Sequence, residues 1–169
     1  SGLKWSSGGV EKDAWRDTDV KVEGPAARDA QRAFLKNWES RGPPLPAGDL
    51  EKFLPSTPAV ELPGGVPVRV VQHRPDEDGD EHTMALYLHA IDTAQHDITI
   101  ENAYFVPPRE LTEALLAARK RGVDVRIVTN SESTHDNMPV FHASRFFYDE
   151  LLAAGVKIYE KTGGTLHAK

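Results

Sequence analysis

A histidine and a lysine stand two residues apart near the end of the chain, in the stretch GGTLHAK at residues 163–169. Gly163 and Gly164 can adopt the positive φ angles that a tight reversal needs, and the residues after them alternate as a strand does. Residues i and i+2 of a strand share a face, so His167 and Lys169 are predicted to project to the same side. An imidazole and an ammonium group side by side suit the binding and chemistry of a phosphate.

The composition excludes several classes of protein. The 169 residues contain no cysteine, so disulfides, thiol catalysis and cysteine-bound metals are excluded. No apolar run approaches the roughly 20 residues of a membrane-spanning helix, and the start of the chain lacks the pattern of a signal peptide. The formal net charge of -6 argues against a general nucleic-acid-binding surface, which needs many cationic contacts, but it leaves room for one basic pocket.

Strands and helices are predicted to alternate along the second part of the chain. Apolar residues at every second position predict strands, and apolar residues three and four apart predict helices. The predicted strands are residues 68–72, 97–101, 123–129 and 156–160, and the predicted helices are residues 82–94, 107–121 and 143–154. Short connections imply right-handed crossovers, so the predicted fold class is α/β with a mixed, largely parallel sheet covered by helices. His167 is expected on a further strand, paired through the glycine turn.

The first part of the chain has a different organisation. Residues 18–23 alternate as a strand does, and a Gly-Pro pair then opens a predicted helix over residues 26–40. Phe34 and Trp38 belong to the predicted apolar face of this helix. Seven prolines between residues 41 and 67 prevent a regular helix, so this range is interpreted as a connector between two structural units.

A doubly wound nucleotide-binding domain has a similar sheet, so the sequence was tested for this alternative. Binding a dinucleotide requires a glycine-rich turn between a strand and the following helix. The two turns available are FVPPREL, residues 105–111, and TNSESTHDNMPV, residues 129–140, and neither contains glycine. The nucleotide-binding interpretation is therefore disfavoured, and a Walker phosphate loop is absent from the sequence as well.

Four blocks, in order, resemble the second half of phospholipase D superfamily enzymes of the cardiolipin synthase type: IENAYFVPPREL, AARKRGVDVRIVTNS, ASRFFYDELLAAGVKIYEK and GGTLHAK. The LHAK stretch resembles the start of the family's HxKxxxxD signature. Two stretches nearer the N-terminus also resemble the family. The strand and helix that close the first half are similar to WRDTDVKVEGPAARDAQRAFLKNWE. The block GGxN, which follows the first signature, is similar to SGLKWS. Four ordered blocks are far more specific than an isolated HxK.

The resemblance implies a phospholipase D-like α-β-α sandwich and a division of the chain into three parts. Residues 1–40 resemble the end of the first half, residues 41–67 the connector, and residues 68–169 the second half, truncated at the second motif. The family's aspartate comes five residues after the lysine and would fall beyond Lys169, and the first signature would lie before Ser1. The chain is therefore expected to be a fragment between two catalytic motifs.

The resemblance also implies a phosphodiester-transfer reaction. In the family, the histidine of the first signature is usually the nucleophile, and the histidine of the second is usually the general acid and base. His167 is thereby expected to be the acid and base, and Lys169 to bind phosphate oxygens, which lets such a site work without a metal or other cofactor. Without the signature's aspartate, the His167 imidazole is expected to be unoriented, and the fragment alone to be inactive.

Other residues carry weaker predictions. Asn102 follows a strand end, and it either lines the substrate pocket or caps a turn. Lys4 stands where the family block GGxN has asparagine, and it either binds a substrate anion or points outward. His135, Asp136 and Asn137 could mimic a metal site, but consecutive loop residues rarely converge, so a solvated loop is favoured. The remaining histidines are assigned no role.

The predicted function is phosphodiester transfer or hydrolysis on phospholipid head groups through a phosphohistidine intermediate. The alternatives are a nuclease of the same superfamily, which the acidic balance disfavours, and a non-catalytic binding module that keeps the fold. The expected partners are a phospholipid or other phosphodiester substrate and, through the full-length protein, a membrane surface, but not nucleic acid. The resemblance places the protein in bacteria, in the cytoplasm or at the membrane periphery, and leaves the oligomeric state open.

Overall fold

The computed structural model describes residues 15–44, 46, 50–54, 64–72 and 82–168. The chain forms two compact units. The first unit combines Ser1–Asp19 with Met84–Lys169, and the second is Val20–Thr83. The predicted division at residues 40 and 67 stays a prediction.

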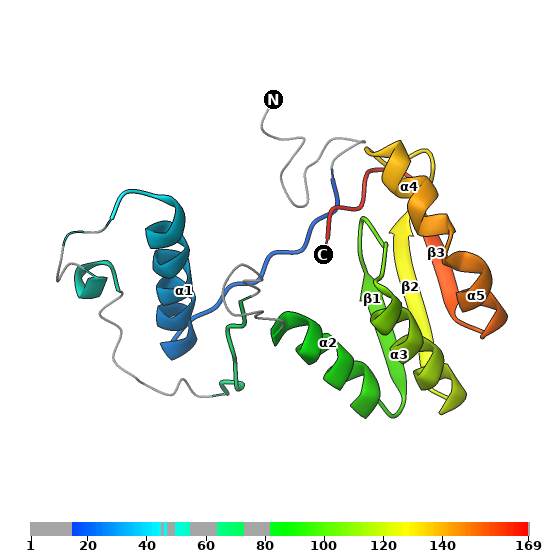
Figure 1. Ribbon diagram of the computed structural model, residues 1–169, viewed down its shortest axis with the longest axis horizontal. Coiled ribbons are helices and arrows are strands. Elements are labelled where there is room, and N and C mark those ends of the chain that lie inside the picture. Colours follow the sequence, from blue (N-terminus) through cyan, green and yellow to red (C-terminus); the bar gives the residue numbers. More distant parts are fainter. Residues whose placement is uncertain (1–14, 45, 47–49, 55–63, 73–81, 169) are drawn as a thin grey trace. The chain divides into compact units, whose positions relative to one another are not determined.

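A three-stranded parallel sheet forms the centre of the first unit (Figure 1). Its strands are β1 (Asp97–Glu101), β2 (Asp124–Asn130) and β3 (Lys157–Lys161), in the spatial order β1-β2-β3. The register pairs Ile98 with Val125 and Ile127 with Ile158. The predicted α/β class with a parallel sheet is therefore confirmed.

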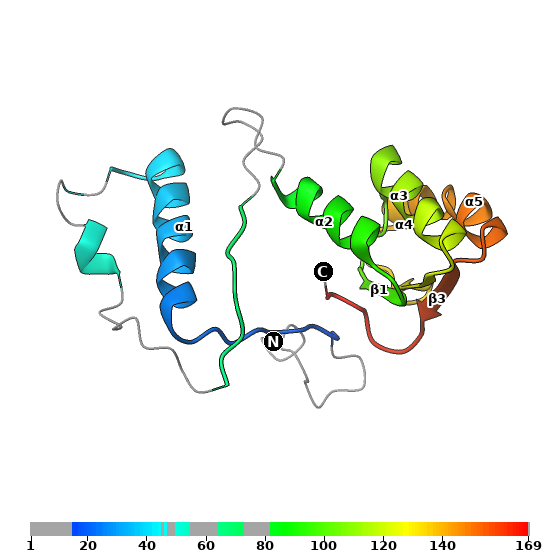
Figure 2. The same cartoon turned by 90° about the horizontal axis from the view of Figure 1, so that it is seen from below.

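Helices connect the strands and lie over one face of the sheet. They are α2 (His82–Thr93) before β1, α3 (Arg109–Lys120) between β1 and β2, and α4 (Met138–Arg145) and α5 (Tyr148–Ala153) between β2 and β3. Successive right-handed crossovers in one direction place their helices on the same side, and Figure 2 shows α3, α4 and α5 together above the strands. Gly122 follows the C-cap of α3, and its φ of 90° is the left-handed conformation that suits glycine.

The hydrophobic core lies between this sheet face and the helices. Strand β2 is the central strand, so its alternate residues Val125 and Ile127 point into the core and are fully buried. Leu115 of α3 and Leu151 of α5 are fully buried against them. The amphipathic pattern predicted for α3 is confirmed, because its buried residues lie three apart: Thr112, Leu115 and Ala118.

The helix predicted over residues 143–154 is wrong in its extent, because the structure has two helices there. The Phe146 N–H donates to the Ala143 carbonyl at 3.3 Å, and the Phe147 N–H donates to the Ser144 carbonyl at 3.2 Å. These bonds span three residues instead of four, so they tighten the chain and interrupt the α-helix. The break leaves the Phe146 side chain 83% exposed.

The second unit contains the helix α1 (Pro25–Arg41) and the short 3-10 helix η2 (Leu50–Phe53). The predicted apolar face of α1 is wrong, because its buried residue is Leu35 at 3% exposure, whereas Phe34 is 56% exposed. The strands predicted over residues 18–23 and 68–72 are wrong as well, because neither described segment forms a strand. Val20 in the first of these segments is 80% exposed, so its alternating pattern does not bury an apolar face.

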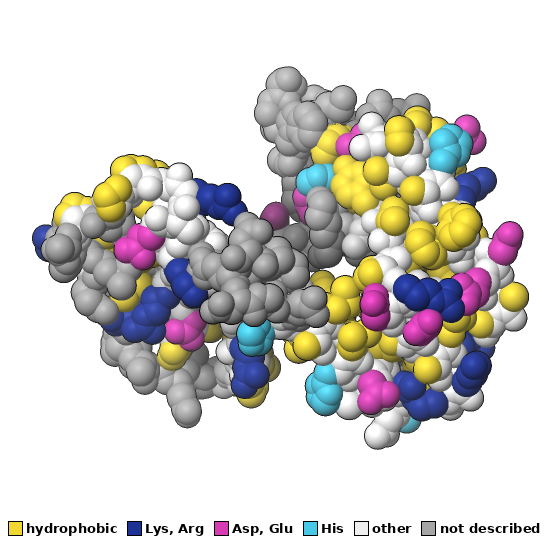
Figure 3. Space-filling model, in the orientation of Figure 1, with side chains coloured by type: hydrophobic (Ala, Val, Ile, Leu, Met, Phe, Trp, Pro, Cys, Tyr) yellow, Lys and Arg dark blue, Asp and Glu magenta, His cyan; other side chains and the backbone are white. Residues whose placement is uncertain are grey.

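Charged side chains of both signs cover the face formed by α3 and α5 (Figure 3). Arg109 contacts Glu113 at 2.8 Å and Glu150 at 2.9 Å. Both contacts are exposed ion pairs, which contribute little to stability because water and salt screen them. They matter more for the charge of this surface, because they place the carboxylates of Glu113 and Glu150 next to the Arg109 guanidinium.

Candidate active site

The segment that carries His167 is extended and pairs with a segment near the start of the chain. Arg16 and Leu166 form a parallel β-bridge. The Arg16 N–H donates to the Thr165 carbonyl at 2.7 Å, and the His167 N–H donates to the Arg16 carbonyl at 2.7 Å. Leu166 is fully buried and Ala168 is 3% exposed, whereas the His167 side chain is 33% exposed. The predicted alternation is confirmed, but the partner is a parallel segment instead of a hairpin strand.

A carboxylate contacts the His167 imidazole. The Nδ1 atom of His167 lies 2.7 Å from Oδ2 of Asp17, and the Asp17 side chain is 31% exposed. Because an ionised carboxylate can only accept a hydrogen bond, Nδ1 carries the proton and donates it to Asp17. The Trp15 ring lies against the same imidazole, with 4.8 Å between the ring centroids. This tautomer makes Nε2 the imidazole nitrogen that can exchange a proton with a substrate.

The expectation that His167 is unoriented in this chain is therefore wrong. Asp17 supplies the orienting carboxylate from a position 150 residues away in the sequence. Sequence reasoning missed Asp17 because it lies in WRDTDV, which resembled only a structural strand of the family. This contact cannot be predicted from a local sequence pattern, because it depends on the β-bridge between Arg16 and Leu166.

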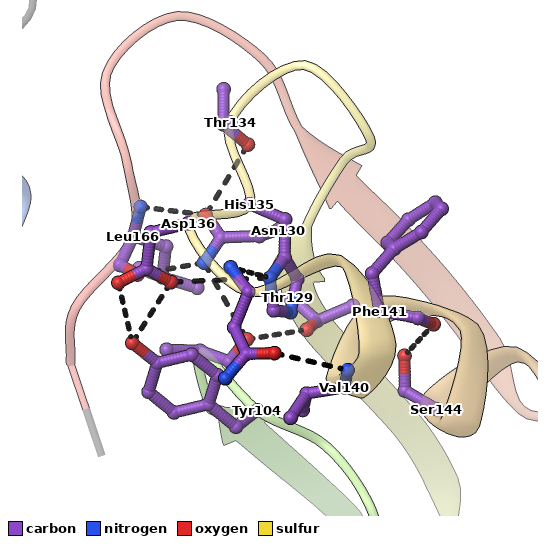
Figure 4. A network of polar contacts seen from close by, with 12 residues as sticks. Tyr104, Thr129, Asn130, Thr134, His135, Asp136, Val140, Phe141, Ser144 and Leu166 are labelled. Atoms are coloured by element: carbon purple, nitrogen blue, oxygen red, sulfur yellow. Dashed lines mark hydrogen bonds and ion pairs between the residues drawn. The ribbon is translucent and has the colours of Figure 1, made fainter.

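The carboxyl ends of β1 and β2 contact the other side of the same segment. The Ala103 N–H, just after β1, donates to the Ala168 carbonyl at 3.2 Å. Asn130, the last residue of β2, hydrogen-bonds the backbone of Leu166 (Figure 4). His167 therefore lies at the end of the parallel sheet where such sheets place their functional residues. Asn130 was not among the predicted site residues.

Tyr104 and Asp136 form a second contact at this end of the sheet (Figure 4). The Tyr104 hydroxyl lies 2.9 Å from each carboxylate oxygen of Asp136. Burial, together with the hydrogen bond to Asp136, raises the pKa of Tyr104, so the phenol keeps its proton and donates it to the carboxylate. This bond joins the segment after β1 to the loop before α4.

Asp136 and Asn137 are exposed, as in the predicted solvated loop, but His135 is buried. Its side chain is 1% exposed, and its ring lies 5.5 Å from the Tyr104 ring and 5.7 Å from the Phe141 ring. Its Nδ1 accepts the Asn137 N–H at 3.0 Å. The Asn137 side chain in turn caps α4 by accepting the Val140 N–H at 3.4 Å. The three polar residues 135–137 thus point to different partners and do not converge on a common centre.

Lowering the pH is expected to destabilise the first unit through His135. Burial lowers the pKa of His135, so the folded state resists its protonation, whereas an unfolded histidine titrates near a pKa of about 6.5. The free energy of unfolding should therefore be highest above about pH 6.5 and should fall as the pH drops below that value, because the unfolded chain takes up the proton first.

The measurement is the Tm between pH 8 and pH 5 for the wild type, for His135→Leu and for the exposed-site control His142→Gln. The wild type and His142→Gln should lose Tm with falling pH by similar amounts, and His135→Leu should lose less. An equal loss in all three proteins would contradict this account of His135.

Asn102 lies directly after β1, and its side chain makes a turn contact. Its Oδ1 accepts the Tyr104 N–H at 2.8 Å, as in the turn-capping alternative. Asn102 also lines a groove of about 670 Å³ between α2, β1 and the segment that leads into α3. The described residues that line the groove do not include His167. A substrate-binding role for Asn102 remains a prediction.

Two of the predicted site residues, Lys4 and Lys169, lie outside the described residues. Their roles at the phosphate remain predictions. The structure therefore brings together His167 with Asp17, which sequence reasoning did not include, and it places Asn102 at the end of the neighbouring strand β1.

Comparison with known proteins identifies the family. Residues 87–169 match the family model described as "Cardiolipin synthase, PLD-like domain". Cardiolipin synthase from Halalkalibacterium halodurans is 38% identical over 157 residues, which cover 92% of this chain and 30% of that protein. The chain belongs to the phospholipase D superfamily. The resemblance found in the sequence is thus confirmed.

A further curated relative of this phospholipase D superfamily chain has similar coverage. Cardiolipin synthase A from Yersinia pseudotuberculosis is 35% identical over 160 residues, covering 92% of this chain and 31% of that protein. The crystal structure of a phospholipase D family member, Nuc from Salmonella typhimurium, is 26% identical, covers 47% of this chain and 48% of that chain, and has a TM-score of 0.36. The chain spans 30% of the length of the first curated relative it matches.

Proposed function

We propose that the full-length protein transfers a phosphatidyl group from a phospholipid to an alcohol or to water through a phosphohistidine intermediate. The observation that carries the proposal is the 2.7 Å contact between His167 Nδ1 and Asp17 in a chain whose relatives are cardiolipin synthases. A histidine oriented by a carboxylate is the arrangement that general acid and base catalysis uses.

The reaction has two steps, and His167 acts in both. In the first, a second histidine attacks phosphorus, a P–N bond forms, the P–O bond to the leaving alcohol breaks, and His167 Nε2 gives that alcohol a proton. In the second step, His167 Nε2 takes a proton from the acceptor alcohol or water while the acceptor oxygen attacks phosphorus and the P–N bond breaks. The carboxylate of Asp17 stabilises the imidazolium form that His167 has before the first step and regains in the second.

Positive side chains would stabilise the phosphate during both steps. In the proposal, Lys169 neutralises the non-bridging phosphate oxygens, and Lys4 adds a charge where the family block has a neutral asparagine. Asn102 adds a polar group at the end of β1. These three roles rest on the family resemblance and on the positions of the residues in the sequence.

The substrate class follows from the relatives and from the charge of the protein. The matched relatives are cardiolipin synthases, which favours a phospholipid substrate. Nucleic acid is disfavoured by the net charge of -6 and by the carboxylates that flank the basic groups over α3 and α5. Among the described helices, none is long and apolar enough to cross a membrane. We propose that other parts of the full-length protein bring the site to the membrane surface.

Asp17→Asn in the full-length protein is expected to lower kcat by about 10²-fold on a phosphatidyl substrate. The amide keeps the size of the carboxylate but removes its negative charge, so it no longer stabilises the His167 imidazolium. The measurement is release of the head-group alcohol from phosphatidylglycerol in mixed micelles.

A matched control is Asp19→Asn, which makes the same chemical change at an exposed position two residues away. Asp19→Asn should keep the wild-type kcat. If Asp17→Asn also keeps it, the carboxylate does not support His167 and the proposed role of the pair is wrong. An inactive wild type would instead contradict the proposed function itself.

A further inference from the structure

Asn130 binds the backbone of the residue that precedes His167. Its side chain is at the end of β2 and is 1% exposed. Its Oδ1 accepts the Leu166 N–H at 2.7 Å, and its Nδ2 donates to the Leu166 carbonyl at 2.8 Å (Figure 4). One amide thus satisfies both backbone groups of one residue, as a neighbouring strand would do.

The opposite edge of this segment is bonded to Arg16. The carbonyl of Thr165 accepts the Arg16 N–H, and the His167 N–H donates to the Arg16 carbonyl, both at 2.7 Å. Successive residues of a strand direct their backbone groups to opposite edges, so Leu166 faces Asn130 whereas its two neighbours face Arg16. The Asn130 side chain therefore takes the place of a strand on one edge of the segment that carries His167.

Only an amide side chain of this length can make both bonds. Aspartate has two acceptors and no donor when ionised, so it would repel the Leu166 carbonyl, and leucine would leave both Leu166 backbone groups without a partner. The position of the amide is itself fixed, because Thr134 Oγ1 lies 3.3 Å from Asn130 Oδ1 and Nδ2 lies 3.4 Å from the Ala103 carbonyl. The Ala103 N–H also bonds the segment, at Ala168.

We propose that Asn130 is a positioning residue for the acid and base His167. It touches Leu166 and not the substrate, and it sets where the imidazole stands between Asp17 and the phosphate. The inference rests on the proposed function of His167. Because a displacement of about 1 Å in a reacting group can cost about 10²-fold in rate, a buried amide next to His167 can control kcat without contacting the substrate.

The test compares Asn130→Leu and Asn130→Asp with the wild type in the full-length protein. Both variants should lower kcat by about 10²-fold, because His167 is displaced from the position in which it transfers the proton. KM should stay nearly unchanged, because substrate binding is not affected. The deficit in the first turnover should be smaller on a nitrophenyl phosphodiester, whose leaving group departs without needing a proton. A stability control is Leu151→Ala, which removes a fully buried side chain of α5 and should lower Tm without changing kcat.

A second measurement does not depend on activity. In the wild type, the Leu166 amide should exchange with solvent slowly, because it is buried and donates to Asn130. In protein labelled with ¹⁵N at histidine, the Nδ1–H signal of His167 should shift in Asn130→Asp or Asn130→Leu and stay in place in Leu151→Ala. These two readouts test the inference even if the wild type does not act on phosphodiesters. An inactive wild type would contradict only the proposed function.

Three results on rate and amide exchange would overturn the inference. They are an unchanged kcat in a folded Asn130 variant, an equal loss of first-turnover rate on the activated and the ordinary phosphodiester, and free exchange of the Leu166 amide in the wild type. The Asn130 variants could lose Tm by as much as Leu151→Ala and show the same kinetics as that control. Asn130 would then contribute only to stability, which would also contradict the positioning role.

Discussion

Replacing His167 by alanine in the full-length protein is expected to lower kcat on a phosphatidyl substrate by about 10³-fold. The variant loses the proton donor for the leaving alcohol and the proton acceptor for the incoming alcohol, so both steps of the proposed reaction slow. Substrate binding should change less, because the lysines proposed to bind the phosphate remain. The measurement is steady-state turnover of phosphatidylglycerol, with KM determined for each protein.

A matched control makes the same substitution elsewhere. His142→Ala removes an exposed histidine on α4 and should keep the wild-type kcat. The fold is expected to survive in both variants, because the His167 side chain is one-third exposed and Leu166 beside it stays buried. A His167→Ala protein that folds and retains more than about a tenth of the wild-type kcat would contradict the proposed acid and base role.

The 169-residue chain, purified alone, is expected to fold and to show no phosphodiester turnover. Folding is expected because its first unit has a parallel sheet with a buried core that includes Val125, Ile127 and Leu151. Turnover is not expected, because the covalent step needs a second histidine, and the family resemblance places that histidine before Ser1. Members of one catalytic unit are strongly non-additive, so one of two histidines should give little of the rate.

The contact with Asp17 changes the reason for this expected inactivity. His167 is already oriented in the 169-residue chain, so the expected inactivity rests on the proposed second histidine and not on an unoriented acid. The assay compares the isolated chain with the full-length protein on phosphatidylglycerol, after circular dichroism has shown that the chain is folded. Sustained turnover by the isolated chain that is lost in His167→Ala would show that a complete site lies within these 169 residues.

Local patterns were sufficient to predict most of the α/β unit. The helix α3 and the strand β2 follow from apolar residues at helical and alternating spacing, together with the stop signal at Gly122. The division between α4 and α5 could not be predicted, because it depends on two backbone bonds at Phe146 and Phe147 that the side-chain pattern does not encode.

The candidate site was only partly predictable for the same reason. His167 was found because its motif is local, and Asn102 was found because it follows a strand end. Asp17 and Asn130 reach the site through backbone pairing with distant residues, so spacing along the sequence does not report them. The polar residues 135–137 looked solvated in the sequence, but packing between Tyr104 and Phe141 buries His135.

The central claim, that His167 donates the proton to the leaving alcohol, is tested most directly by varying the leaving group. The first turnover of wild-type and His167→Ala full-length protein is measured on phosphatidylglycerol and on a nitrophenyl phosphodiester. We predict a loss of about 10³-fold on phosphatidylglycerol and a much smaller loss on the nitrophenyl substrate, whose leaving group departs without a proton. An equal loss on both substrates, or a covalent phosphate found on His167 itself, would contradict the account.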